Sequence, residues 1–105
     1  MNPAEKVNLN EWIGDARGGI LSKKVLAKKS GNITMFALAA GEVISEHSAP
    51  FDALVVIHDG KAQVTIGGQE HIVSAGEAII LPANIPHGLK ALEAFKMLLV
   101  MIKSE

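Results

Sequence analysis

The chain has 105 residues, of which 49% are apolar, and its formal net charge is −1. This length allows one domain with a real core, and the near-neutral charge disfavours nucleic-acid binding, which needs a basic surface to neutralise phosphates. The absence of cysteine excludes disulfides, thiol catalysis and thiolate metal sites. The N-terminus lacks the apolar core of a signal peptide and no apolar run is long enough to span a membrane, so we expect a cytoplasmic protein.

Residues 1–32 are expected to supply N-terminal strands and a turn to a barrel or a dimer, and residues 33–105 the barrel core, all within one domain. Val7 and Leu9 alternate with polar residues, which allows a short strand, and a turn of helix is predicted over 10–16. The remainder reads as short strands separated by turn residues. The predicted strands cover 20–27, 33–39, 43–48, 53–58, 61–66, 69–73, 78–81 and 95–103.

Short strands at this close spacing predict an all-β sandwich or barrel. Valine and isoleucine dominate the strands, and no segment has a sustained helical period. Asp59-Gly60 predicts a two-residue hairpin turn with positive φ at Gly60, after which 61–66 returns beside 53–58. Gly67-Gly68 predicts a further turn between 61–66 and 69–73.

Three predicted strands are apolar on both faces, whereas an antiparallel strand with one face in water should alternate. These apolar runs are 54–57, 79–81 and 98–102. One face of each run fills the barrel, and the N-terminal segment is too short and polar to cover the other face of all three. The simplest cover is a second subunit on a two-fold axis, so we expect a homodimer.

Two stretches that resemble each other in pattern carry one histidine each. The stretch 41–60, GEVISEHSAPFDALVVIHDG, contains His47, and the stretch 76–91, GEAIILPANIPHGLKA, contains His87. If the segments of these two stretches that carry His47 and His87 lie side by side as strands, both imidazoles point into one cavity. Strict alternation along 43–48 places Ser45 and His47 on one face and Glu46 on the other.

The other two histidines are not expected to belong to the site. His58 has the parity of Leu54 and Val56, opposite to the expected inward face, so we expect it on the outer surface or in an interface. His71 could take either face, and a surface imidazole is its expected role. Ser45 and Ser48 flank His47, but no acid is placed to orient the imidazole as a Ser-His-Asp triad requires, so no catalytic residue is predicted.

The two histidine stretches resemble the two motifs of the cupin family, G-x5-H-x-H-x3,4-E-x6-G and G-x5-P-x-G-x2-H-x3-N. The positions that match are Gly41, His47, Gly60, Gly76, Pro82 and His87. The resemblance covers about 33–102 and implies a jelly-roll β-barrel, usually dimeric, with a site inside its mouth. In the family, two histidines and a glutamate of the first motif and one histidine of the second bind a divalent metal.

This chain departs from the motifs at the metal positions. The second histidine position is occupied by Ala49 and the glutamate position by Ala53. In the second motif Asn84 replaces glycine and Ala91 replaces asparagine. The change at residue 84 is mild, because asparagine tolerates left-handed backbone conformations.

Only two metal-ligand positions are therefore retained. Two neutral imidazoles leave a dication without charge compensation, so we expect weak or absent binding of zinc, nickel, manganese or iron by His47 and His87. Asp52 adjoins the vacated glutamate position, and a register shift in the Pro50 loop would bring it inward as a third ligand. The alternative is two polar residues that are hydrogen-bonded to each other or to water.

The leading hypothesis is a cupin that binds a small molecule in an aliphatic barrel mouth with two histidines as polar anchors. A second hypothesis is a metal-dependent oxygenase or isomerase that uses His47, His87 and Asp52. A third is a sensor or accessory protein without chemistry. The expected pocket residues are Met35, His47, Ala49, Phe51, Ala53 and His87.

Overall fold

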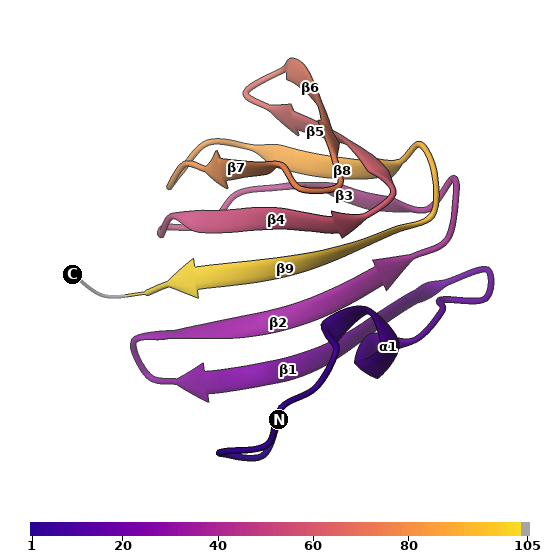
Figure 1. Cartoon of the computed structure of the whole chain (residues 1–105). Helices are drawn as coiled ribbons and strands as arrows, with labels where there is room; N and C mark the ends of the chain where they lie inside the picture. Colours follow the sequence, from indigo (N-terminus) through magenta and orange to yellow (C-terminus); the bar gives the residue numbers. More distant parts are fainter. Residues whose placement is uncertain (104–105) are drawn as a thin grey trace.

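The computed structural model describes residues 1–103, so the last two residues of the expected 33–105 core lie outside the described part. Two antiparallel sheets form an all-β jelly roll, which confirms the predicted fold class (Figure 1). The five-stranded sheet has the order β1-β2-β9-β4-β7 and the four-stranded sheet β3-β8-β5-β6. The elements are α1 (Leu9–Ile13), β1 (Ile20–Lys28), β2 (Gly31–Leu38), β3 (Val43–His47), β4 (Ala53–Asp59), β5 (Lys61–Ile66), β6 (Gln69–Ser74), β7 (Ala78–Leu81), β8 (His87–Ala91) and β9 (Phe95–Ile102).

The core lies between the two sheets and is built by strand alternation. Along β4, Ala53, Val55 and Ile57 are buried against the four-stranded sheet, while the residues between them face outward. The core residues of β9, which pairs with β4, and of β5 in the facing sheet follow the same period, because side chains on one face recur at every second residue. The fully buried members include Val64 on β5 and Met97 on β9.

The N-terminal segment forms a helix where a short strand at Val7 and Leu9 was one expectation. Asn8 caps α1, since its side-chain oxygen accepts a hydrogen bond from the backbone N–H of Glu11 at 3.1 Å. The helix lies over β1 and β2, on the outer face of the five-stranded sheet (Figure 1). Ile13 is buried there, against β2.

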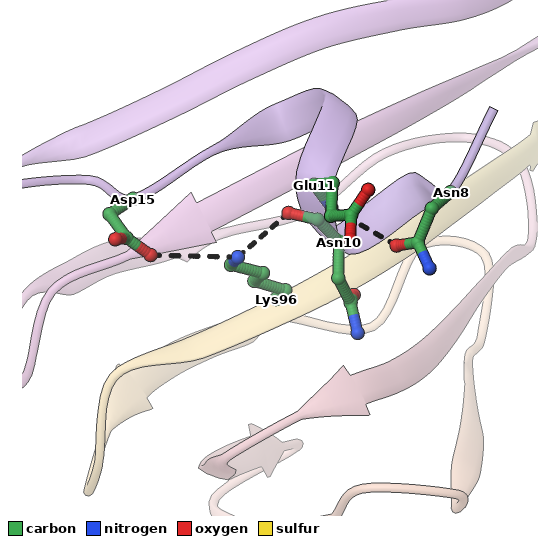
Figure 2. A network of polar contacts seen from close by, with 5 residues as sticks. All are labelled: Asn8, Asn10, Glu11, Asp15 and Lys96. Carbon is green, nitrogen blue, oxygen red and sulfur yellow. Dashed lines mark hydrogen bonds and ion pairs between the residues drawn. The ribbon is translucent and has the colours of Figure 1, made fainter.

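A lysine of β9 fastens this segment to the sheet. The Lys96 ammonium donates a hydrogen bond of 2.7 Å to the Asn10 carbonyl and lies 3.6 Å from the Asp15 carboxylate (Figure 2). The Lys96 side chain is 15% exposed, so these contacts are partly shielded from water. The chain therefore covers one half of the outer face of this sheet with its own N-terminus.

The other half of that outer face carries a row of aliphatic side chains, one from each strand. The cross-strand pairs join into the apolar row Leu26, Ile33, Val100, Leu54 and Ile80. Leu26 is 52% and Ile80 61% exposed. The N-terminal segment thus covers one half of the apolar outer face of these strands. No described residue covers the other half.

We propose that a second copy of the chain covers the apolar row. Wild-type protein at micromolar concentration is then expected to sediment as a dimer. Ile80→Lys should shift it towards monomer, because a charge buried in the interface is costly. Ile72→Lys is the matched control, since Ile72 is 54% exposed on the other sheet. A wild-type protein that sediments only as a monomer would contradict the proposal.

Gly60 does not lie in a hairpin, so that prediction was wrong. β4 pairs with β7 and β9, whereas β5 pairs with β6 and β8 in the other sheet. Gly60 is the corner at which the chain crosses from one sheet to the other, and its φ of 78° confirms the positive φ. Asp59-Gly60 correctly predicted a sharp turn. The turn joins two sheets rather than two paired strands, because β4 and β5 pair with different neighbours. The Gly67-Gly68 hairpin is confirmed by the pairing of β5 with β6.

Candidate metal and ligand site

One end of the barrel, which we call the mouth, is lined by two inward-facing rows. The five-stranded sheet contributes the first row, in which each residue pairs with the next across neighbouring strands: Asn32, Met101, Ala53 and Leu81. The four-stranded sheet contributes the second row: His47, His87, Ile66 and Gln69. Both predicted histidines therefore lie on adjacent strands and face the same interior.

A β-bulge brings His47 into this row. Ile44 pairs with Leu89 and His47 pairs with His87, so two residues of β3 lie opposite the single residue Gly88 of β8. The extra residue puts Ile44 and His47 on the same face. The predicted alternation, with His47 on the face of Ser45, was therefore wrong from the bulge onward, although the inward direction of His47 was right.

The two imidazoles lie in edge contact with their Nδ1 atoms engaged. Their ring centroids are 4.5 Å apart and the ring planes meet at 69°. His47 Nδ1 lies 2.8 Å from the Ser45 carbonyl oxygen, and His87 Nδ1 lies 3.2 Å from the Ile85 carbonyl oxygen. A carbonyl can only accept, so each Nδ1 carries a proton, and in the neutral imidazole each Nε2 keeps a free lone pair. Such backbone contacts fix the ring and its tautomer in the way that metal-bound histidines require.

The two histidines differ in solvation. His87 is 6% exposed, whereas His47 is exposed at the rim. Burial lowers the pKa of His87 below its ordinary value, and the charge of a protonated His47 lowers it further, against the opposing effect of the Ile85 carbonyl. His87 is therefore held in the neutral form at neutral pH, which is the form that can accept a hydrogen bond or bind a metal.

This pKa predicts a pH dependence of stability in metal-free protein. Because the folded-state pKa of His87 is lowered, the unfolded chain binds more protons near and below pH ~6.5, so the free energy of unfolding should fall as the pH drops through that range. Urea unfolding with a chelator present, between about pH 5 and 8, measures this loss. His87→Gln should lose less stability on acidification than the wild type. Equal losses in both proteins would contradict the assignment.

The vacated ligand positions are present in the backbone but lack donor atoms. Ala53 belongs to the mouth and is 9% exposed. Ala49 lies in the loop after β3, partly buried, and its carbonyl accepts a 2.7 Å hydrogen bond from the Asn84 N–H. Asn84 has a φ of 63°, which bears out the expectation that asparagine adopts the left-handed conformation there.

Asp52 does not supply a third ligand, so that hypothesis was wrong. Its carboxylate accepts a 2.8 Å hydrogen bond from the Ala83 N–H and thereby ties the loop before β4 to the loop before β8. Within residues 1–103 no three histidine, aspartate or glutamate side chains lie close enough together to hold a metal ion. The donor set in the described chain is the histidine pair alone.

Of the two larger side chains expected in the pocket, Met35 lies elsewhere and Phe51 lies near the mouth. Met35 is fully buried on the opposite face of β2, beneath α1 with Ile13 and Ala37, so its assignment to the mouth was wrong. Even-numbered residues of β2, such as Phe36, face the barrel instead. Phe51 is partly buried near this end, and the Lys103 ammonium lies 6.0 Å from the centre of its ring.

Sequence reasoning missed three polar residues of the inner face. Asn32 and Gln69 belong to the mouth, and His71 pairs with Val64 and so faces inward one step deeper. The Asn32 Oδ1 atom is buried and has no hydrogen-bond partner within the described part of the chain. Asn32 has the same strand parity as Phe36, so alternation would have placed it inward only if the inward face of β2 had been known. His58 is exposed on the outer face of β4, as predicted.

Comparisons with known proteins agree with this architecture. The cupin domain matches residues 34–103. A conserved protein of unknown function from Streptococcus pyogenes is 38% identical over 100% of this chain and 92% of its own, with a TM-score of 0.94. A cupin 2 conserved barrel domain protein from Leptotrichia buccalis is 40% identical over 89% of this chain and 45% of its own, with a TM-score of 0.85.

A cupin superfamily protein from Desulfitobacterium hafniense is 27% identical, over 95% of this chain and 93% of its own, with a TM-score of 0.87. No protein with a curated description matches the chain. No helix among residues 1–103 is long and apolar enough to cross a membrane.

Proposed function

The chain belongs to the cupin family, and we propose that it binds a small molecule in the barrel mouth, with His47 and His87 as polar anchors that also hold a divalent metal weakly. The observation that carries the proposal is the arrangement of the pair. Both Nδ1 atoms are committed to backbone carbonyls, so both Nε2 lone pairs are free, on rings whose centres lie 4.5 Å apart.

A divalent metal fits this pair in donor type but not in donor number. Neutral imidazole nitrogen is a good ligand for zinc, nickel and iron, but structural and catalytic sites supply three or four protein donors. His47 and His87 would hold the ion, and water or the bound molecule would fill the remaining positions. A bound metal would supply a Lewis acid that polarises an oxygen atom of the ligand.

The mouth also indicates which chemical groups the ligand carries. Its walls include the aliphatic and thioether side chains of Leu81, Ile66 and Met101, which suit an apolar body. Its polar atoms include the two Nε2 lone pairs and the buried Oδ1 of Asn32, all of which accept hydrogen bonds. A small molecule with hydroxyl or N–H donors on an apolar frame complements this lining.

The alternative of a metal-dependent oxygenase or isomerase lacks support at the site. Two-histidine iron oxygenases add a carboxylate to the metal, and within residues 1–103 no carboxylate lies close enough to the histidine pair to be that third ligand. A ligand-binding role, including that of a sensor, needs no third metal ligand and only polar anchors such as His47 and His87 at the mouth. We therefore place the binding function first.

The proposal predicts how histidine variants respond to a metal probe. Wild-type protein titrated with nickel ions should show broadened or shifted ring signals of His47 and His87 by NMR. His87→Ala should lose that response, because one imidazole alone binds a dication more weakly still. His58→Ala is the matched control, since His58 lies exposed on the outer face, and should leave the response intact. Binding that survives both His47→Ala and His87→Ala would refute the site.

A search for the organic ligand uses the same signals. A library of small aliphatic alcohols, amines and amides, added to metal-free protein, should shift the two imidazole signals and the Asn32 side-chain amide together. Ligands that shift only residues of the outer faces would count against binding in the mouth.

A further inference from the structure

We infer that Gly88 is a positioning residue: it makes room for the β-bulge of β3, and the bulge determines that His47, rather than Glu46, faces His87. Only the metal readout of this inference rests on the proposed function. The geometric part stands on strand pairing alone.

The bulge determines which residue of β3 lies opposite His87 of β8. Ile44 pairs with Leu89, and both pack in the core between the sheets. In a regular antiparallel pair, two steps towards the mouth would bring Glu46 opposite His87, with both side chains inward. The observed pairing of His47 with His87 exists because β3 carries one extra residue over this interval. The bulge thus exchanges a carboxylate for an imidazole beside His87.

Gly88 is the residue that the bulge crowds. A Cβ atom at this position would lie 3.2 Å from the Ile44 carbonyl oxygen and 3.4 Å from the N and Cα atoms of Glu46. These are backbone atoms of the bulge, so they cannot rotate away as the end of a side chain would. Gly88 is not among the glycines with positive φ, so the requirement here is for space and not for an unusual backbone conformation.

The bulge has a second effect on the same imidazole. Bulged residues leave backbone groups outside the regular ladder. Here the Ser45 carbonyl oxygen lies 2.8 Å from His47 Nδ1 and fixes the tautomer that frees Nε2. Flattening the bulge would therefore remove both the inward direction of the His47 ring and the contact that orients it.

Substitution at Gly88 separates this role from general stability. Valine is favoured in strands, so Gly88→Val adds no backbone strain of its own, but its γ carbons extend the contact with the bulge. Gly88→Ala requires the bulge to move by only a few tenths of an ångström and should have a smaller effect. Thr65→Val is the control, because Thr65 pairs with Gly88 from the neighbouring strand and the change keeps its volume.

Two readouts follow the position of His47 in protein that still unfolds cooperatively. The first is the nuclear Overhauser effect between the ring protons of His47 and His87 in metal-free protein, which their 4.5 Å centroid separation makes observable. The second is zinc affinity by calorimetry. We expect Gly88→Val to lose the ring-to-ring signal and at least tenfold in affinity, Gly88→Ala to be intermediate, and Thr65→Val to match the wild type.

The outcomes distinguish this inference from the proposed function. Gly88→Val with the ring-to-ring signal intact overturns it, as does a wild type in which the signal is missing. A wild type that shows the signal but binds no zinc refutes the metal site, while the signal in the variants still decides the role of Gly88. If Gly88→Val does not fold, Gly88→Ala decides the question by the same comparison: a weakened signal supports the inference and an unchanged signal overturns it.

Discussion

Gly60→Val is expected to destabilise the protein by at least about 2 kcal/mol, with two causes that add. A residue with a Cβ at a φ of 78° costs about 1–2 kcal/mol, and more for a β-branched side chain. In addition, a Cβ atom at Gly60 would overlap the Ala94 carbonyl oxygen and come within 2.8 Å of the Phe95 Cα. Backbone of the loop before β9 would have to move, and overpacking of this kind costs about 1–3 kcal/mol.

A second glycine separates the two causes. Gly68 has a φ of 83°, but a Cβ atom there would meet nothing within 4 Å. Gly68→Ala therefore reports the conformational cost alone, and Gly60→Ala the conformational and steric costs together. Urea unfolding of the two alanine variants should show the larger loss at Gly60. Equal losses would remove the steric part of the argument, and an unchanged melting temperature in Gly60→Val would refute the corner itself.

The sequence predicted the strands better than their partners. Turn residues mark strand ends locally, so 61–66 and 78–81 were predicted with the bounds that β5 and β7 have. Pairing depends on contacts between distant segments, and the corner at Gly60 was for that reason mistaken for a hairpin. Strand β8 was not predicted as a separate element, because Pro82 and Pro86 precede it and Gly88 lies near its start, and proline and glycine are typical of loops.

Which face of a strand is inward was equally hard to predict. Alternation defines two faces of β2 but does not say which one meets the other sheet, and the apolar cover that α1 provides makes the outer face look like core. Met35 was misassigned for this reason. The bulge in β3 could not be predicted either, because it is a relation between β3 and Gly88 of a strand about forty residues further along the chain.

The histidines themselves were predictable, whereas the use of Asp52 was not. Motif spacing brought His47 and His87 together, and the structure places them in edge contact. Proximity in sequence suggested Asp52 as a ligand, but a loop N–H that needs an acceptor has engaged its carboxylate. Sequence proximity does not reveal which loop the side chain of Asp52 contacts, because that loop lies about thirty residues further along the chain.

The double variant Ala49→His, Ala53→Glu is expected to bind a divalent metal at least tenfold more tightly than the wild type, a gain of at least about 1.4 kcal/mol. It would supply three imidazoles and a carboxylate, which satisfies zinc, nickel or manganese in donor number and partly in charge. The inward position of Ala53 in the mouth supports the glutamate. Each single variant should gain less than the double variant, because each leaves the donor set incomplete.

The central claim is that His47 and His87 form an incomplete metal site, and the most direct test is calorimetry of zinc binding to the wild type and the double variant after dialysis against a chelator. We predict that the wild type emerges metal-free and rebinds zinc weakly, through two neutral donors, and that the double variant binds it at least tenfold more tightly. A wild type that keeps one metal ion per chain through the dialysis would contradict the claim, because a third donor would then have to come from outside the pair.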